Sequence, residues 1–164
     1  MVNFMLRIIN LRTFSLISLC SLFLVGCNLF APLKKDAQLV IINVLDKAEF
    51  DDCHIQGSIN IPFDEFENKV ASLSKYNHYV LYCADYACMS SAFCVKLLKD
   101  AGIEHVWEYD GGIVEWYQKG YPIEGAAHEE YLKLENINFN DEKLSTSITA
   151  EELLVKIEEF SSKK

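Results

Sequence analysis

Positive charge is scarce in this sequence. Its 15 lysines and arginines stand against 24 aspartates and glutamates, which gives a formal net charge of -9 at pH 7. Both arginines, Arg7 and Arg12, lie near the N-terminus, and no block of basic residues occurs anywhere. A nucleic-acid-binding surface needs clustered lysine and arginine. We therefore expect no nucleic-acid partner.

Metal-ligating residues are also sparse. The four histidines are scattered along the chain, and the adjacent Cys53 and His54 have no further ligands at the spacing of a zinc site. We expect no metal and no other cofactor. His54 is instead expected to cap or hydrogen-bond the turn before Ile55. With 164 residues and no internal repeats, the chain has room for one domain with extensions.

The N-terminus has the form of a bacterial export signal. Arg7 and Arg12 precede an apolar run, residues 14–25, which is too short to span a bilayer comfortably. Residues 24–27, LVGC, resemble the lipobox of bacterial lipoproteins, whose cysteine is lipidated after cleavage. We expect residues 1–26 to be a lipoprotein signal peptide and Cys27 to carry the lipid. An ordinary signal peptide or an uncleaved anchor is the alternative.

The lipoprotein resemblance also predicts a location. Residues 27–35 would form a lipidated tether, and Pro32 keeps this segment out of regular structure. Asn28 stands where an aspartate retains lipoproteins of enteric bacteria in the inner membrane. The resemblance thus implies an anchor in the cell envelope, in the outer membrane and facing the periplasm if the organism is Gram-negative.

Strand and helix patterns alternate from residue 36 onward. Short apolar strands are expected at residues 39–44, 59–61, 78–82 and 106–108. Helices are expected at residues 64–73, 90–101 and 113–118. The nearly continuous apolar run of the first strand is typical of a parallel sheet that is buried on both faces. The pattern predicts an α/β domain with a small, mostly parallel sheet flanked by helices.

Two cysteines lie where a strand pattern turns into a helix pattern. Cys83 comes directly after the third expected strand, and Cys88 lies close to the start of the following helix. Free backbone N–H groups and the helix dipole stabilise a thiolate at such a junction, and the thiolate is the reactive form of cysteine. Parallel sheets bind ligands at the carboxyl ends of their strands. Cys83 is therefore the candidate nucleophile.

Three motifs resemble those of rhodanese-like domains. Residues 54–62, HIQGSINIP, look like the histidine-containing motif that follows the first strand. Residues 110–116, DGGIVEW, followed by GYPI, look like the glycine-tryptophan element that closes the domain. Between them, Cys83 occupies the place of the active-site cysteine. The resemblance covers residues 36–125 and implies a rhodanese fold with sulfurtransferase activity.

The active loop departs from the family pattern. Single-domain rhodaneses commonly have an arginine five positions after the cysteine, and Cys88 stands there in this chain. The aspartate and arginine of the first strand appear as Asn43 and Leu45. Without basic residues from Cys83 to Ser91, thiosulfate should bind poorly, and phosphoryl transfer lacks the positive charge that it needs.

The resemblance implies that Cys83 takes up a sulfane sulfur as a persulfide and passes it to a thiol or cyanide. Backbone N–H groups of the loop could form a nest for an anion. Negative charge at Asp85 favours neutral or thiol-bound sulfur donors. The substrate loop is expected to comprise Ala84, Asp85, Tyr86, Ala87 and Met89.

Several alternatives remain open for the cysteines. Cys88 is either a resolving thiol that attacks the Cys83 persulfide or forms a disulfide with Cys83, or a residue that packs against the sheet. Cys83 itself is either reactive or an inert buried cysteine, and Cys94 is expected in the core. The chain is thus a sulfurtransferase, a non-catalytic module that binds a protein partner, or a thiol–disulfide switch.

Residues 126–164 form an acidic C-terminal extension. Residues 149–152, TAEE, have the form of a capping box. An apolar stripe on the helix expected at residues 150–160 is formed by Leu153, Leu154, Ile157 and Phe160. We expect this stripe to pack on its own domain, with a protein partner or a second copy of the chain as the alternative.

Overall fold

The computed structural model describes residues 36–135 and 146–163. The expected signal peptide, the lipidation site Cys27 and the tether to residue 35 lie outside the described residues. Within the described ranges, none of the helices has the length and apolar character needed to cross a membrane.

Four parallel strands form the main sheet, in the order β3-β1-β4-β5. They are β3 (Ile59–Asn60), β1 (Leu39–Asn43), β4 (His78–Tyr82) and β5 (Val106–Tyr109). The register sets Tyr82 beside Asn43 on one side and beside Tyr109 on the other, so three strands end at the same edge. The predicted α/β class with a mostly parallel sheet is confirmed.

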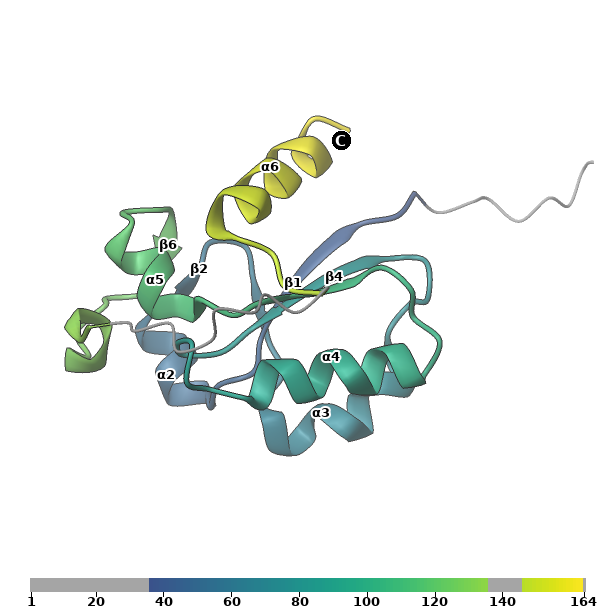
Figure 1. Cartoon of the computed structure of the whole chain (residues 1–164), viewed down its shortest axis with the longest axis horizontal. Helices are drawn as coiled ribbons and strands as arrows, with labels where there is room; N and C mark the ends of the chain where they lie inside the picture. Colours follow the sequence, from purple (N-terminus) through teal and green to yellow (C-terminus); the bar gives the residue numbers. More distant parts are fainter. Residues whose placement is uncertain (1–35, 136–145, 164) are drawn as a thin grey trace, which may run out of the picture. The chain divides into compact units, whose positions relative to one another are not determined.

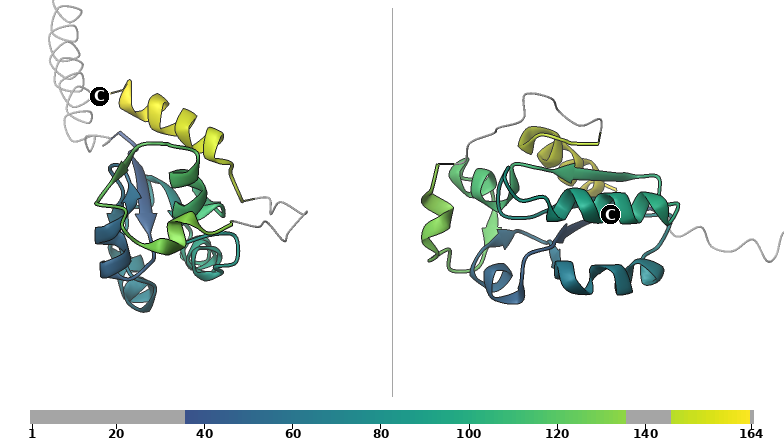
Figure 2. Two further views of the ribbon diagram at one scale, coloured as in Figure 1. Left: turned by 90° about the vertical axis from the view of Figure 1, so that its left-hand side faces the viewer. Right: turned by 60° about the horizontal axis from the view of Figure 1, so that its bottom comes forward.

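Helices cover both faces of this sheet, as Figure 1 and Figure 2 show. On one face lie α3 (Phe63–Lys69) and α4 (Ser90–Asp100), and on the other lies α6 (Ala150–Ser161). Near the carboxyl ends of the strands lie α2 (Lys47–Asp52) and α5 (Gly112–Gln118). Because helices cover both faces, the central strand β4 carries buried residues on both of its faces.

Some short elements escape the sequence prediction. β2 (His54–Ile55) pairs antiparallel with β6 (Ile123–Glu124), and two 3-10 helices occur at η2 (Val70–Ser72) and η3 (Glu130–Lys133). The helix expected at residues 64–73 is therefore α3 followed by η2. Strands of two residues have no measurable periodicity, and only their pairing across the fold creates them.

The C-terminal extension packs on its own domain. Thr149 caps α6 in the predicted capping box with Glu152. Leu153 is fully buried, and Leu154 and Ile157 pack partly buried against the core. The prediction of intramolecular packing is confirmed, whereas the docking of a protein partner through this helix stays a prediction.

The extension also covers the edge of the sheet at β5. The amide nitrogen of Glu108 donates to the carbonyl oxygen of Thr146 at 2.9 Å, and that of Ile148 donates to the carbonyl oxygen of Glu108 at 2.8 Å. These hydrogen bonds satisfy backbone groups that an edge strand would otherwise leave unpaired. The C-terminal extension thereby fixes the backbone of β5 at Glu108.

Candidate active site

Cys83 lies directly after β4, at the edge where the parallel strands end. The residue is only 1% exposed. Its sulfur donates to the carbonyl oxygen of Cys88 at 3.1 Å and lies 3.4 Å from the hydroxyl oxygen of Ser91. The structure therefore places Cys83 beneath the loop that joins β4 to α4, where these neighbours hold its thiol.

Cys88 lies at the other end of this loop and is half-buried. A hydrogen bond from the Cys83 thiol lowers the pKa of Cys88 to about 5, and the backbone N–H groups of Ser90 and Ala84 act in the same direction. For Cys83, the hydrogen bond to Cys88, burial and the negative charge of Cys88 all raise the pKa. In the resting pair, the negative charge therefore belongs to Cys88 and the proton to Cys83.

The protonation states of the two cysteines depend on each other, because the charge of Cys88 raises the pKa of Cys83. The sequence predicts a stabilised thiolate at Cys83 in this strand-to-helix junction, whereas the contacts in the structure raise the pKa of Cys83 and lower that of Cys88. Exposure and hydrogen bonding decide in favour of Cys88. The four described cysteines, Cys53, Cys83, Cys88 and Cys94, are free thiols.

The loop uses part of its hydrogen-bonding capacity on itself. The carboxylate of Asp85 accepts from the amide nitrogen of Ala87 at 3.0 Å, and its carbonyl oxygen accepts from that of Cys88 at 3.1 Å. Such a turn consumes two of the N–H groups that the sequence assigns to an anion-binding nest. The amide groups of Ala84 and Ser90 are directed at sulfur instead.

The remaining loop residues lie at different depths. Tyr86 and Ala84 are half-buried, and Ala87 is exposed. Burial, followed by the nearby Glu115, raises the pKa of Tyr86 well above its usual range. Met89 is 66% exposed and immediately precedes α4. The expected substrate loop is thus a partly closed cover over Cys83 with an apolar side chain at its outer end.

Helix α5 holds this cover in place. The amide nitrogen of Ile113 donates to the carbonyl oxygen of Cys83, and that of Val114 to the carbonyl oxygen of Ala84, both at 3.0 Å. These first-turn N–H groups have no partner within their own helix. They consequently position the start of the active loop.

Two further residues lie below the cysteines, and sequence analysis assigns them no role. Ser91 is fully buried in the first turn of α4, and Glu108 is 4% exposed within β5. The hydroxyl of Ser91 donates to a carboxylate oxygen of Glu108 at 2.7 Å. The signal that could have revealed this pair is an acidic residue inside an otherwise apolar strand.

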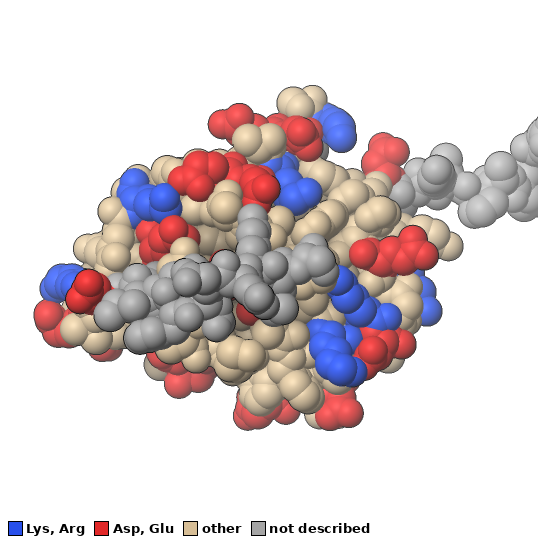
Figure 3. Space-filling model, viewed as in Figure 1, with Lys and Arg blue, Asp and Glu red and all other residues tan. Residues whose placement is uncertain are grey.

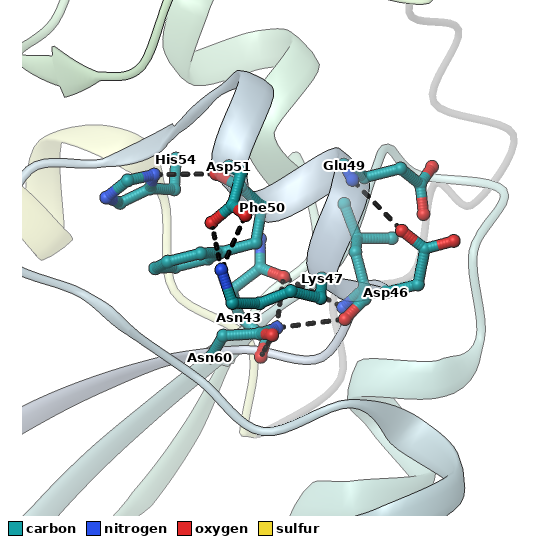
Figure 4. Close-up of polar contacts among 9 residues, drawn as sticks. Asn43, Asp46, Lys47, Glu49, Phe50, Asp51, His54 and Asn60 are labelled. Atoms are coloured by element: carbon teal, nitrogen blue, oxygen red, sulfur yellow. Dashed lines mark hydrogen bonds and ion pairs between the residues drawn. The ribbon is translucent and has the colours of Figure 1, made fainter.

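The end of β1 carries Asn43 and Leu45 at the two positions where the rhodanese resemblance implies charged residues. Asn43 accepts from the amide nitrogen of Leu45 at 2.8 Å, and the side chain of Asn60 donates to the carbonyl oxygen of Leu45 at 2.9 Å, as Figure 4 shows. Asp46 then caps α2 through the amide nitrogen of Glu49 at 2.9 Å. The amide side chains of Asn43 and Asn60, together with the carboxylate of Asp46, order the turn after β1.

His54 fastens the turn between α2 and β2. Its Nδ1 donates to the carbonyl oxygen of Phe50 at 2.7 Å, and its ring stacks on the ring of Phe50 (Figure 4). The predicted hydrogen bond at this turn is confirmed. In the part of the chain that the structure describes, no three His, Cys, Asp or Glu side chains are grouped so as to hold a metal ion.

Negative charge surrounds the cysteine pair. Burial and Asp46 raise the pKa of Glu49, and the charge of Cys88 adds to this rise. Burial likewise raises the pKa of Glu108, to which Asp110 and Cys88 contribute. On the face drawn in Figure 3, acidic and basic side chains are interspersed and no basic patch is visible. An anionic substrate would meet repulsion at this site.

Comparisons with known proteins agree with this geometry. The model of the rhodanese-like domain family matches residues 29–119. The HTH-type transcriptional regulator Rv0324 of Mycobacterium tuberculosis is 31% identical over 94 residues, 57% of this chain and 41% of the regulator. The adenylyltransferase and sulfurtransferase uba4 of Sclerotinia sclerotiorum is 27% identical over 104 residues, 55% of this chain and 23% of that protein.

A solved structure shows the same fold. The crystal structure of the BH2092 protein from Bacillus halodurans is 28% identical with a TM-score of 0.50, and the match covers 54% of this chain and 65% of that one. The chain spans less than half the length of either curated relative. The family model matches more than half of the present sequence, and the chain therefore belongs to the rhodanese-like domain family.

Proposed function

We propose that this chain is a sulfurtransferase of the rhodanese type that carries a sulfane sulfur on Cys83. The observation that carries the proposal is the position of Cys83 directly after β4, at the carboxyl edge of the sheet, where its thiol lies 3.1 Å from the carbonyl oxygen of Cys88. The relative uba4 is named a sulfurtransferase, which supports this class of chemistry.

The reaction proceeds by two displacements on sulfur. The deprotonated sulfur of Cys83 attacks the outer sulfur of a donor R–S–SH, a new S–S bond forms, and R–S⁻ leaves with the electron pair of the broken bond. A thiolate or cyanide then attacks the outer sulfur of the Cys83 persulfide and regenerates the Cys83 thiolate.

The donor is expected to be a thiol-bound or neutral sulfane. Cys88 replaces the arginine that would neutralise thiosulfate, and Asp85 turns its carboxylate into the loop. Glu49 adds negative charge within the field of Cys88. A low-molecular-weight persulfide or polysulfide avoids most of the resulting repulsion because it carries less charge than thiosulfate.

Cys88 is proposed as the resolving thiol. Its thiolate attacks the inner sulfur of the Cys83 persulfide, a Cys83–Cys88 disulfide forms, and HS⁻ leaves. A reducing thiol is then needed to restore the pair. The half-buried position of Cys88 and its lowered pKa, about 5, favour this role.

The cell-envelope location is part of the proposal. It rests on residues 24–27, LVGC, after an apolar run. Metabolic labelling of the full chain with a fatty-acid analogue, compared with a Cys27→Ser variant, tests the anchor. Label that persists in the variant would contradict it.

Mass spectrometry of the cysteine peptides tests the proposed chemistry. The reduced protein is treated with inorganic polysulfide and compared with Cys83→Ser and with Cys94→Ala, in which a buried core cysteine is changed. In a Cys88→Ser background, where the persulfide cannot be resolved, we expect one sulfur atom on Cys83, removable by cyanide, both with and without Cys94→Ala; with Cys88 present we expect the Cys83–Cys88 disulfide and released sulfide. An unmodified Cys83 in the wild type would exclude the sulfurtransferase.

Two other functions have observations in their favour. The approach of the Cys83 sulfur to the carbonyl oxygen of Cys88, at 3.1 Å, favours a thiol–disulfide switch, which the same peptide map reveals as the loss of two hydrogens without release of sulfide. Three exposed apolar side chains, Phe63, Met89 and Phe93, favour a binding module. They lie together, because Met89 and Phe93 are one helical turn apart and the rings of Phe63 and Phe93 meet edge-on at 5.7 Å.

A further inference from the structure

A buried carboxylate lies directly beneath the cysteine pair. Glu108 points from β5 toward α4, where it accepts hydrogen bonds from the hydroxyl of Ser91 at 2.7 Å and from the amide nitrogen of Ala92. Burial of a carboxylate is costly, and two donors offset only part of this cost. A buried carboxylate such as that of Glu108 therefore indicates a role beyond packing.

The hydrogen bonds form a continuous chain from Cys83 to Glu108. The sulfur of Cys83 lies 3.4 Å from the hydroxyl oxygen of Ser91, and this hydroxyl in turn donates to Glu108. A serine hydroxyl has one proton to donate. While that proton is given to the Glu108 carboxylate, Ser91 can act toward Cys83 only as an acceptor, and its oxygen competes with the carbonyl oxygen of Cys88 for the single thiol proton.

We infer that Ser91 and Glu108 form a proton relay that removes the proton of Cys83 during sulfur transfer. Glu108 acts through Ser91 and touches no substrate, so it is a positioning and proton-accepting residue. The inference rests on the proposed function, because the relay is useful only if sulfur transfer requires a thiolate at Cys83. It rests on the hydrogen-bonded chain for its geometry.

The step conserves protons and charge. The S–H bond of Cys83 breaks as its proton moves to the oxygen of Ser91, and the proton of Ser91 moves to the carboxylate of Glu108. The electron pair of the S–H bond stays on sulfur as the thiolate. Ser91 then donates through both its hydroxyl and its amide nitrogen toward this thiolate, and both interactions favour the charged form. Reversal of the relay returns the proton when the persulfide has been discharged.

The surroundings of Glu108 suit an acceptor of protons. Burial raises the pKa of Glu108, and the negative charges of Asp110 and Cys88 act in the same direction, while the hydrogen bonds from Ser91 and Ala92 oppose them. Among the described residues of the C-terminal extension, Thr146 and Ile148 contact Glu108 through backbone hydrogen bonds. A base of raised pKa takes up a proton more readily near neutral pH.

The test measures thiol alkylation in the full chain with Cys88→Ser as background, so that Cys83 is the thiol left at the loop. Iodoacetamide is the probe, and peptide mapping gives the rate at Cys83 as a function of pH. The variants Glu108→Gln, Glu108→Asp and Ser91→Ala are added to this background. Glutamine keeps an oxygen that can accept from Ser91 and from the amide of Ala92, so the start of α4 keeps its hydrogen bonds.

The relay predicts a characteristic pH profile in the background protein. Moving a proton from Cys83 to Glu108 leaves the net charge unchanged, so the alkylation rate should be independent of pH around neutrality and fall where Glu108 is already protonated. We expect Glu108→Gln and Ser91→Ala to abolish this plateau, so that the rate rises steadily with pH. At about pH 7 the rate should drop roughly 10- to 100-fold, at the lower end of general-base effects. Glu108→Asp should restore part of the plateau.

A merely structural Glu108 gives a different result. Loss of its negative charge would then lower the pKa of Cys83. The alkylation rate of Cys83 in Glu108→Gln would be higher at every pH, and its rise with pH would keep the same slope. That faster reaction of Glu108→Gln would overturn the relay. A plateau that survives in both Glu108→Gln and Ser91→Ala would also overturn it. So would the absence of Cys83 alkylation at every pH at which the protein stays folded. Alkylation needs no sulfur donor. A protein that shows the pH-independent alkylation rate but takes up no sulfur from polysulfide would therefore refute the proposed function and leave the relay standing.

Discussion

Gly112 lies against the carbonyl group of Ala84. Its φ angle is +62°, and a Cβ atom at this position would lie 2.4 Å from the carbonyl oxygen of Ala84. Only glycine fits here, because both the backbone conformation and the contact exclude a side chain. The start of α5 can therefore approach the active loop closely enough to bind the carbonyl oxygens of Cys83 and Ala84.

Replacement of Gly112 should loosen the active loop. Gly112→Ala is expected to lower the free energy of unfolding by about 3 kcal/mol, since it combines left-handed strain with a backbone clash. Gly120→Ala is the matched control, because Gly120 has a φ of +70° with nothing within 4 Å of the added Cβ. It should cost about 1 to 2 kcal/mol for strain alone. Urea unfolding measures both, and equal losses would show that the contact with Ala84 is unimportant.

Removal of the Cys83 thiol should make Cys88 less acidic. In the wild type, the alkylation rate of Cys88 should rise through a midpoint near its pKa of about 5. Cys83→Ala deletes the hydrogen bond that contributes most to this low pKa. We expect the midpoint to move up by roughly one to two pH units, the equivalent of about 1.5 to 3 kcal/mol for a hydrogen bond to a charged group. An unchanged midpoint would show that the backbone N–H groups suffice.

The buried cysteines provide the control for that measurement. Burial raises the pKa of Cys53 to about 11 and that of Cys94 to about 12. In the folded protein both should alkylate slowly over the whole neutral range, and Cys94→Ala should leave the Cys88 profile unchanged. Rapid labelling of Cys94 would indicate that the protein had opened.

An arginine at position 88 should restore the use of thiosulfate. Its guanidinium group can bind the anionic donor with two parallel hydrogen bonds and offset the negative charge of Asp85 and Glu49. We expect Cys88→Arg to transfer sulfur from thiosulfate to cyanide at least about tenfold faster than Cys88→Ser. The double variant with Cys83→Ser should be inactive. If Cys88→Arg showed no gain over Cys88→Ser, the missing arginine would not be the cause of poor thiosulfate use.

The contact of α6 with the sheet should weaken in acid. His78 stacks on His105 at 4.4 Å and contacts Phe160 of α6 at 4.9 Å. Burial lowers the pKa of His78, and the positive charges of His105, Lys156 and Lys163 lower it further. A histidine whose folded-state pKa is depressed binds its proton more tightly in the unfolded chain, so stability is full above about pH 6.5 and is lost as the pH falls toward the folded value.

Unfolding measured at two pH values tests this contact. The free energy of unfolding should decrease between about pH 7.5 and pH 5.5, and His78→Phe should reduce the decrease because it removes the titrating group. His128→Gln, at an exposed histidine, is the control and should leave the pH dependence unchanged. A dependence that persists fully in His78→Phe would assign it to other groups.

Local patterns determined the longer strands and helices and the place of Cys83 among them. The apolar run at residues 39–44 predicts β1, and the change of period after residue 82 predicts the end of β4, because burial periodicity is written along a single segment. The same change places Cys83 at the edge where a parallel sheet binds its ligands. The capping box at Thr149 likewise needs only residues three positions apart.

Only the tertiary structure decided the chemistry of that position. The charge lies on Cys88 because Cys83 donates to it from a more deeply buried site, and burial depends on the whole fold. Ser91 meets Glu108 because α4 packs on β5, and Gly112 meets Ala84 because α5 returns to the loop. Hydrogen bonds between segments distant in sequence leave no periodic trace, so proton positions and pKa values follow from the assembled fold.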